Sequence, residues 1–463
     1  MGEGLTPRQA GAAGAVALAG LAAGVAIGVG LSQSSDRRRD TAQLDGTPRR
    51  RFYRGRNLDR AISVEDLRAI THQRLPRFAL EYLEGGAEEE ATLARERSAY
   101  GDWRFTPRTL VDVSHRGLKT EIFGQPAPLP LIVAPTGLNG VYRRHADIML
   151  AQGAMRAGIP FCQSTMSNDS MSDVARSAPG LRHWWQLYVF GGDEVWQELV
   201  RRADANGCEA LILTTNAQIF GNREWQRRNQ ASQDRLSVSS AVDAALHPDW
   251  FVKTLLPTGM PRFPDALDFI PKSHHGLFQS SDWIRDHQPK SLSWDTVAKI
   301  RQRWTRPFIL KGILNLEDVR RAVDAGVDGI VISTHGGRQL DWAVAPLDLL
   351  PKAREIVGDR VLLFLSGGLR RGTDLLKALC LGADAVLAGR SILYGLCAAG
   401  APGVEHAVKI LRKEAEDAMG LLGASSVTEL APDFLLPDPG RRLTQSHAAA
   451  SLSAREASRR VLQ

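Results

Sequence analysis

The sequence contains few of the residues that build metal centres or disulfide frameworks. Only four of its 463 residues are cysteine, and no Cys-x-x-Cys pair or zinc-type Cys/His spacing occurs. We therefore expect a reduced chain without a metal site. Its 43% hydrophobic, 24% charged and 6% aromatic residues are those of an ordinary globular protein, which argues against a mostly disordered or polytopic membrane chain.

The excess of positive over negative charge is also small outside residues 1–60. The formal net charge is +7, and residues 1–60 hold ten Arg against five acidic residues, which accounts for +5 of it. The rest of the chain is nearly neutral. We therefore expect no nucleic-acid partner and relate the excess to membrane topology and contact with anionic lipid.

One long uncharged run lies within residues 1–60. Residues 10–31 are mainly Ala and Gly with Val, Leu and Ile, and the run is long enough to cross a bilayer as a helix. Most of the arginines follow it, so the positive-inside rule leaves the main body in the cytoplasm. We expect membrane contact through residues 10–31. A flexible or cleaved leader is an alternative, and an organelle presequence is a less favoured one.

Eight short apolar runs downstream have the length and bulk of buried parallel strands. They span residues 129–134, 159–164, 184–189, 210–215, 308–312, 329–333, 361–366 and 385–388. Amphipathic segments typical of helices separate most of them, and two helices are expected before the first. This alternation predicts an α/β fold, a (β/α)8 TIM barrel with an N-terminal helical extension. An open doubly wound sheet is the alternative.

The spacing of these strands breaks once. About 90 residues separate the fourth and fifth runs, far more than a crossover needs. We predict an excursion over residues 227–289, and two interpretations stay open: a lid over the site and a membrane-contacting patch. The predicted organisation is an anchor or leader over 1–60, a barrel over 61–437 and a tail over 438–463.

Polar side chains follow the predicted strands, and in such barrels the chemistry gathers at the carboxyl ends of the strands. His335 precedes two glycines and Arg338, which suits a general base beside an anion-binding arginine. Lys311, at a buried strand end, suits a fixed cation near an electron-accepting ring. A Ser-Gly-Gly turn at 366–368 and a Gly-Arg pair at 389–390 are typical of a phosphate site. A phosphorylated cofactor is therefore expected.

Ten segments between residues 61 and 437 together point to one family. They are LPRFALEYLEGGAEEEATL, FTPRTLVDV, APTGLNG, WWQLYV, LILTT, NREW, ILKG, STHGGRQLD, RRGTDLLKALCLGADAVLAGR and LYGL. In these the chain resembles the FMN-dependent 2-hydroxy acid oxidases and dehydrogenases, which include glycolate oxidase and the lactate dehydrogenases. APTGLNG, LHPDW and LAPDFL are most similar to the mandelate dehydrogenases.

The resemblance implies an FMN-dependent oxidation of an (S)-2-hydroxy acid, lactate-like or mandelate-like, to the 2-oxo acid. His335 would be the base, and the residues implied to bind substrate are Tyr82, Tyr188, Arg223 and Arg338. Those implied to bind FMN are Thr136, Ser164, Gln186, Thr214, Lys311, Ser366, Gly368, Arg370, Gly389 and Arg390. Gly137 stands where many oxidases of the family have Ala, which favours an electron acceptor other than oxygen, such as a membrane quinone. A homotetramer is also implied.

Three positions depart from the family pattern. Asn216 replaces the Asp that pairs with the catalytic His, Ser366 replaces the Asp of an FMN-binding Asp-Gly-Gly turn, and Thr334 replaces an Asn. An Asn can orient an imidazole but cannot stabilise an imidazolium. An impaired or non-catalytic flavin-binding protein is therefore the alternative function. An FMN-dependent isomerase ranks last, because it would not need the paired Arg223 and Arg338.

Overall fold

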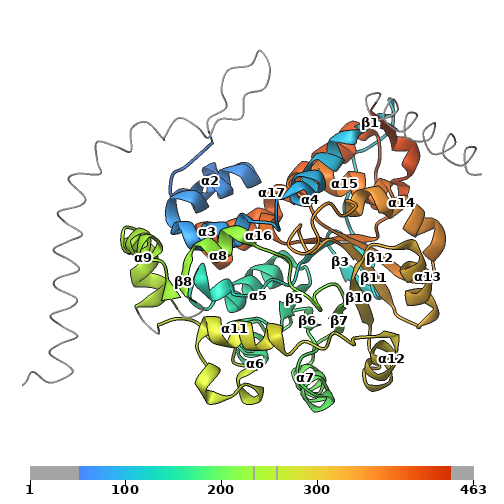
Figure 1. The fold of residues 1–463 in the computed structure, drawn as a ribbon. Coiled ribbons are helices and arrows are strands. Elements are labelled where there is room, and N and C mark those ends of the chain that lie inside the picture. Colours follow the sequence, from blue (N-terminus) through green and yellow to red (C-terminus); the bar gives the residue numbers. More distant parts are fainter. Residues whose placement is uncertain (1–51, 233–234, 257–258, 439–463) are drawn as a thin grey trace, which may run out of the picture.

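Eight parallel strands close into a barrel at the centre of the molecule (Figure 1). A computed structural model of the chain describes residues 52–232, 235–256 and 259–438. The strands, in their order around the barrel, are β4 (Leu131–Val133), β5 (Phe161–Ser164), β6 (His183–Leu187), β7 (Ala210–Thr214), β10 (Phe308–Ile313), β11 (Gly329–Ser333), β12 (Leu362–Ser366) and β13 (Ala385–Ala388). The closed barrel confirms the predicted TIM barrel and excludes the open sheet.

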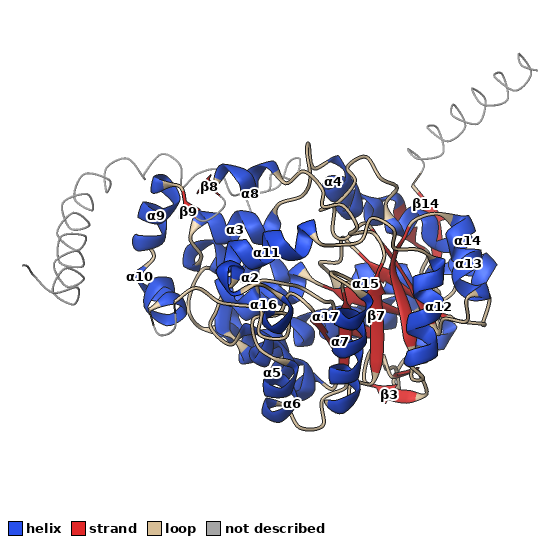
Figure 2. Cartoon of the chain, turned by 60° about the horizontal axis from the view of Figure 1, so that its bottom comes forward, coloured by secondary structure: helices blue, strands red, loops and turns tan. Residues whose placement is uncertain are grey.

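Helices cover the outside of the barrel, as Figure 2 shows. They are α5 (Ala146–Ala157), α6 (Met171–Ser177), α7 (Asp193–Ala205), α12 (Trp294–Arg303), α13 (Leu316–Asp324), α14 (Pro346–Val357), α15 (Gly372–Cys380), α16 (Arg390–Ala399) and α17 (Ala401–Leu422). Their apolar faces pack on the strands, or in the case of α17 on α5, α15 and α16, and form the larger hydrophobic core. A second core fills the barrel, with Trp184 and Phe364 among its members.

A hairpin closes one end of the barrel. It consists of β2 (Thr120–Ile122) and β3 (Gln125–Ala127), and the turn residues Phe123 and Gly124 have φ angles of 52° and 69°. Phe123 packs against Trp184 and Phe364, with ring centroids 5.6 and 5.9 Å away. The hairpin thus blocks access from this end, and the opposite end, where the strands finish, is left for the site.

Within the described residues, the α-helices α2 (Val64–Arg74), α3 (Arg77–Glu84) and α4 (Ala91–Ser98) precede the barrel. The Ser63 hydroxyl caps α2 by accepting from the Asp66 N–H. The chain then forms β1 (Trp103–Phe105), which pairs antiparallel with the last strand, β14 (Leu435–Pro437). This pairing joins the segment between α4 and the barrel to the C-terminal end of the described chain.

The excursion after β7 forms a separate group of short elements, with α9 at the edge of the molecule (Figures 1 and 2). They are α8 (Glu224–Arg228), β8 (Gln230–Ser232), β9 (Arg235–Leu236), α9 (Val238–Ala245), α10 (Pro248–Trp250), the π-helix η5 (Phe251–Leu255) and α11 (Leu277–Asp286). Trp250 anchors the group, because its indole N–H donates to the Val141 carbonyl at 2.8 Å and its ring packs edge-on against Phe78.

The predicted membrane run, residues 10–31, lies outside the described residues, as does most of the predicted tail. Across the residues that are described, no helix combines the length and the apolar character needed to span a bilayer.

Candidate active site

A cavity of about 660 Å³ opens at the carboxyl ends of the barrel strands. Every predicted site residue lines it except Gln186 and Thr214. These two lie next to the lining: the Ser164 hydroxyl donates to Gln186 Oε1 at 2.8 Å, and Thr214 pairs in register with Lys311. The α3 helix and the excursion complete the cavity wall. The predicted residues, scattered over 300 positions of sequence, therefore meet in one place.

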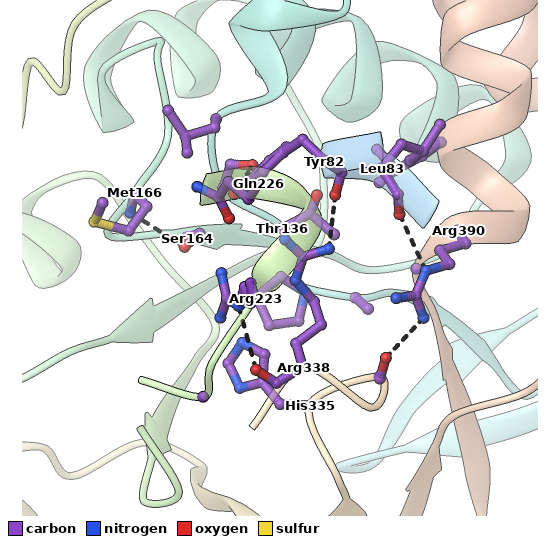
Figure 3. Close-up of a pocket in the computed structure, with 18 of the residues that line it drawn as sticks. Tyr82, Leu83, Thr136, Ser164, Met166, Arg223, Gln226, His335, Arg338 and Arg390 are labelled. Carbon is purple, nitrogen blue, oxygen red and sulfur yellow. Dashed lines mark hydrogen bonds between the residues drawn. The ribbon is translucent and has the colours of Figure 1, made fainter. Parts of the chain in front are cut away.

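His335 directly follows Thr334 at the end of β11 and has a φ of 63°, an uncommon value for a residue with a side chain. Its backbone N–H donates to the Ser333 hydroxyl at 3.0 Å, which helps to hold this conformation. The imidazole stacks on the Tyr188 ring at 15° and lies beside Arg223 and Arg338 in Figure 3. The left-handed turn thus directs the ring into the cavity.

Asn216 fixes the tautomer of His335. The Asn216 amide donates from Nδ2 to the Ser333 carbonyl at 3.1 Å, which turns Oδ1 toward His335 Nδ1 at 3.3 Å. Nδ1 therefore carries the proton and donates to Asn216. Nε2 is left as the acceptor, and the Tyr188 hydroxyl donates to it at 3.2 Å. The basic nitrogen of a neutral imidazole is thus Nε2, as a general base at the cavity requires.

The surroundings of His335 oppose its protonation. Burial lowers the pKa of the imidazole well below its usual value, and the positive charges of Lys311, Arg223, Arg338 and Arg390 lower it further. At neutral pH the ring is therefore uncharged and ready to accept a proton. The same charges would destabilise the imidazolium once it forms.

Two arginines next to His335 carry charge that no carboxylate in the described structure neutralises by an ion pair. Arg338 donates to the carbonyls of Tyr82 and Gly85 at 2.6 and 3.0 Å, and its guanidinium lies 4.7 Å from the Tyr82 ring centroid. Arg223 donates to the Arg338 carbonyl at 3.2 Å (Figure 3). Burial and the neighbouring Arg338 lower the pKa of Arg223 to about 9. Such a pair favours a bound anion.

A second cationic end of the cavity lies near the turns after β12 and β13. Arg390 donates to three carbonyls, those of Leu83, Gly85 and Gly336, at 2.9–3.1 Å. Burial lowers its pKa to about 10. Gly368 has a φ of 73°, and a Cβ there would lie 2.1 Å from the Glu96 carbonyl oxygen, so only glycine fits. The turn exposes backbone beside an arginine, as a phosphate site does.

Between the two cationic ends, polar atoms that lack partners lie in the cavity wall or directly behind it. Within the described residues, Thr136 Oγ1 and Gln186 Nε2 are buried without a hydrogen bond. Lys311 is 4% exposed, and burial lowers its pKa to about 8. Buried polar groups are normally satisfied, so this set indicates a polar ligand between the two ends.

A family model described as FMN-dependent dehydrogenase matches residues 71–437. The chain belongs to this family. An (S)-mandelate dehydrogenase of Pseudomonas putida is 38% identical over 375 residues, which cover 81% of this chain and 93% of that protein. An L-lactate dehydrogenase of Caulobacter sp. (strain K31) is 36% identical, with 81% and 98% covered.

A solved structure of a monotopic membrane protein, (S)-mandelate dehydrogenase, superposes with a TM-score of 0.77 at 37% identity and covers 81% of this chain and 99% of that one. Membership of the FMN-dependent dehydrogenases confirms the predicted family and its cofactor, FMN. The cavity fits this cofactor: one end suits the phosphate, the orphaned Thr136 and Gln186 atoms suit the polar edge of the ring, and Lys311 suits the charge gained on reduction.

Several cavity residues were not expected from the sequence. Phe220, Leu277 and Phe278 add apolar surface, and Glu96 adds a carboxylate. Leu277 and Phe278 come from the excursion and Phe220 from the loop between β7 and α8. These irregular stretches have no periodicity to indicate which side faces inward. Glu96 lies in a run of charged residues on α4, and only its burial in the fold distinguishes it from its neighbours.

Proposed function

We propose that the chain oxidises an (S)-2-hydroxy acid to the 2-oxo acid and passes the electrons to an acceptor other than oxygen. The observation that carries this proposal is the neutral imidazole of His335, which faces the cavity between Tyr188 and two arginines without ion pairs. The named relatives, mandelate and lactate dehydrogenases, act on acids of this class. When bound, FMN would supply the acceptor for the two electrons and for the one hydrogen of the substrate that His335 does not take.

The side chains around His335 have separate roles. Arg223 and Arg338 bind the carboxylate and, with Tyr82 and Tyr188, hold the 2-hydroxyl group near His335 Nε2. The imidazole takes one proton from the substrate. Its Nδ1–H remains hydrogen-bonded to Asn216 Oδ1 throughout. The α3 and excursion residues that line the cavity reduce the access of water.

Apolar side chains lie around the substrate end of the cavity. Met166, Phe220, Leu277 and Phe278 line it, so the site accepts a hydroxy acid with a hydrophobic or aromatic substituent. Anaerobic mixing of the yellow protein with a panel of 2-hydroxy acids tests the proposal. We expect an (S)-2-hydroxy acid with a bulky apolar group to bleach the visible absorbance of the flavin faster than glycolate does, and the (R) enantiomers not to bleach it. Protein that takes up FMN but is bleached by no 2-hydroxy acid would refute the activity.

The proposal of an electron acceptor other than oxygen rests on Gly137. An added Cβ there would lie 2.6 Å from the Met166 Cβ, so the Ala of many oxidases does not fit without a shift. A membrane quinone is the proposed acceptor. Steady-state rates with a soluble quinone analogue should therefore greatly exceed those with air as the acceptor. Equal rates with both would contradict it.

An impaired or non-catalytic flavin-binding protein is the second candidate. It is favoured by Asn216, which supplies no negative charge to His335. Restoring a carboxylate at position 216 separates the two candidates.

We also propose that the excursion contacts a membrane surface, with the barrel in the cytoplasm. Large apolar side chains are exposed on α9, on η5 and on the residue that follows each of them: Val238, Val242, Leu246, Phe251, Val252 and Leu256. Val238, Val242 and Leu246 are four residues apart and thus share one face. Exposed apolar clusters mark interaction sites, and the mandelate dehydrogenase neighbour is a monotopic membrane protein. The excursion would then act both as a wall of the site and as a membrane contact.

Vesicle flotation tests this surface. We expect protein that lacks residues 1–50 to float with anionic phospholipid vesicles. The triple variant Val238→Ser/Val242→Ser/Leu246→Ser should weaken this vesicle binding roughly 10- to 100-fold, because burial of apolar side chains drives it. The matched control is Ile62→Ser/Leu421→Ser/Leu436→Ser, which removes equally exposed apolar side chains elsewhere. If both triple variants bind alike, α9 is not the contact.

A further inference from the structure

Glu96 places a carboxyl group in the wall of the cofactor cavity. It lies on α4, before the barrel, and is only 2% exposed. Its side chain lines the cavity together with Ser366 and the glycines of the β12 turn. Fully buried glutamates are rare unless they are paired, so this position needs an explanation.

One oxygen of Glu96 is held and the other is not. The Thr334 hydroxyl accepts from the Gly337 N–H at 3.0 Å and donates to Glu96 Oε1. Among the described residues, Oε2 is buried without a hydrogen-bond partner. The carboxyl also packs on the β12 turn, because a Cβ on Gly367 would lie 2.8 Å from Glu96 Cδ. The carboxylate is thus oriented by Thr334, and one oxygen is left for a ligand.

Burial raises the pKa of the Glu96 carboxyl above its usual value, and the hydrogen bond from Thr334 and the nearby cations oppose this rise. Arg390, Arg370 and Lys311 are the cations that act on it, and all three line the same cavity. An ionised Oε2 is an acceptor and needs a donor. The phosphate of FMN is an anion, and the ring presents mainly acceptors. The ribityl chain, by contrast, carries hydroxyl groups that can donate.

We propose that Glu96 is an FMN-binding residue whose Oε2 accepts a hydrogen bond from a ribityl hydroxyl, and that it supplies the carboxylate that Ser366 lacks. Ser366 stands where the family pattern has Asp, and Thr334 stands where it has Asn. In this chain the acid has moved from β12 to α4, and Thr334 is the hydroxyl that positions it. The proposal rests on the FMN assignment.

Cofactor affinity tests the proposal without reference to turnover. Apoprotein is titrated with FMN and with a flavin phosphate whose side chain is a pentyl chain without hydroxyls, and flavin fluorescence is followed. We expect Glu96→Met to weaken FMN binding on the order of 10- to 100-fold, as for loss of a charge-assisted hydrogen bond. Binding of the pentyl analogue should change little. The matched control Glu90→Gln, six residues earlier at the start of α4, should leave both affinities unchanged.

A second pair of variants tests the relocation of the acid. Ser366→Asp alone would place two carboxylates in one wall and should weaken FMN binding, because like charges repel. In the Glu96→Gln background, which keeps an acceptor for Thr334, the same Ser366→Asp change should strengthen binding. The sign of the effect therefore reverses between the two backgrounds. Melting curves of the apoproteins show whether each variant is folded.

Three results would overturn the proposal. One is equal loss of FMN and analogue binding in Glu96→Met, which would make Glu96 a purely structural residue. Another is no change in FMN affinity in that variant. The third is the same effect of Ser366→Asp in both backgrounds. Failure of the unmodified protein to bind FMN is a distinct outcome, since it would overturn the cofactor assignment on which the proposal rests.

Discussion

His335→Gln is expected to slow substrate-dependent bleaching of the flavin by roughly 10²- to 10⁴-fold, the usual contribution of a general base. Gln has no basic nitrogen to take the proton that Nε2 accepts. It keeps a side-chain amide that can bond to Asn216 and Tyr188, so the cavity should retain its shape. The phosphate end is built from other residues, and the variant should stay yellow. Stopped-flow absorbance under anaerobic conditions measures the effect.

The control for this variant is His183→Gln. His183 is also buried, but its Nε2 bonds to Gln163 at 2.9 Å and it does not line the cavity. Its bleaching rate should match that of the unmodified protein. Full-speed bleaching by His335→Gln would remove His335 from the role of base.

The pH profile of the unmodified protein gives a further check. The base must be neutral to act, so the rate should rise with pH through the pKa of His335 and then level off. Burial and four cations lower that pKa well below the usual value for histidine. The acid limb should therefore lie below the ordinary imidazole range.

The barrel could be predicted because its strands are buried on both faces and so read as apolar runs. The limits of β11 and β13 match the predicted 329–333 and 385–388. The third run was predicted to end at Val189, but β6 ends at Leu187. There the Tyr188 N–H donates to the Thr165 hydroxyl and not to a neighbouring strand. A side-chain acceptor that competes with the ladder cannot be recognised from hydrophobicity.

The location of the site could also be predicted, and for a related reason. Carboxyl ends of parallel strands converge, so polar residues after the strands of one barrel must meet. Glu96 follows no such rule, because α4 precedes the barrel and reaches the site only through tertiary packing. The strands β1 and β14 were also missed, since three-residue strands are too short to show a period.

Asn216→Asp is expected to have the second large effect, a gain in the rate of flavin bleaching on the order of 10- to 10³-fold, below the loss of about 10⁴ seen when such an Asp is removed from a catalytic triad. His335 Nδ1 lies 3.3 Å from Asn216 Oδ1, so an Asp would place a negative charge beside the imidazolium. At an effective dielectric of about 20, unit charges about 4 Å apart interact by roughly 4 kcal/mol. That attraction would offset the surrounding cations.

The same change should shift the pH dependence of the rate. The carboxylate stabilises the protonated ring and so raises the pKa of His335, which moves the acid limb to higher pH and raises the plateau above it. A structural cost is also expected. Asn216 Nδ2 donates to the Ser333 carbonyl, and an Asp oxygen there would face another acceptor, which lowers the free energy of unfolding by roughly 1–3 kcal/mol.

Asn216→Ala separates charge from orientation. It removes the partner that fixes the His335 tautomer and adds no charge, so it should lower the bleaching rate where Asn216→Asp raises it. A rate gain with Asp and a loss with Ala would establish an enzyme limited by the missing carboxylate. If unmodified protein, Asp variant and Ala variant all bind FMN but none is bleached by any 2-hydroxy acid, the residues around His335 no longer support catalysis. The chain is then a flavin-binding protein that keeps the geometry of a dehydrogenase.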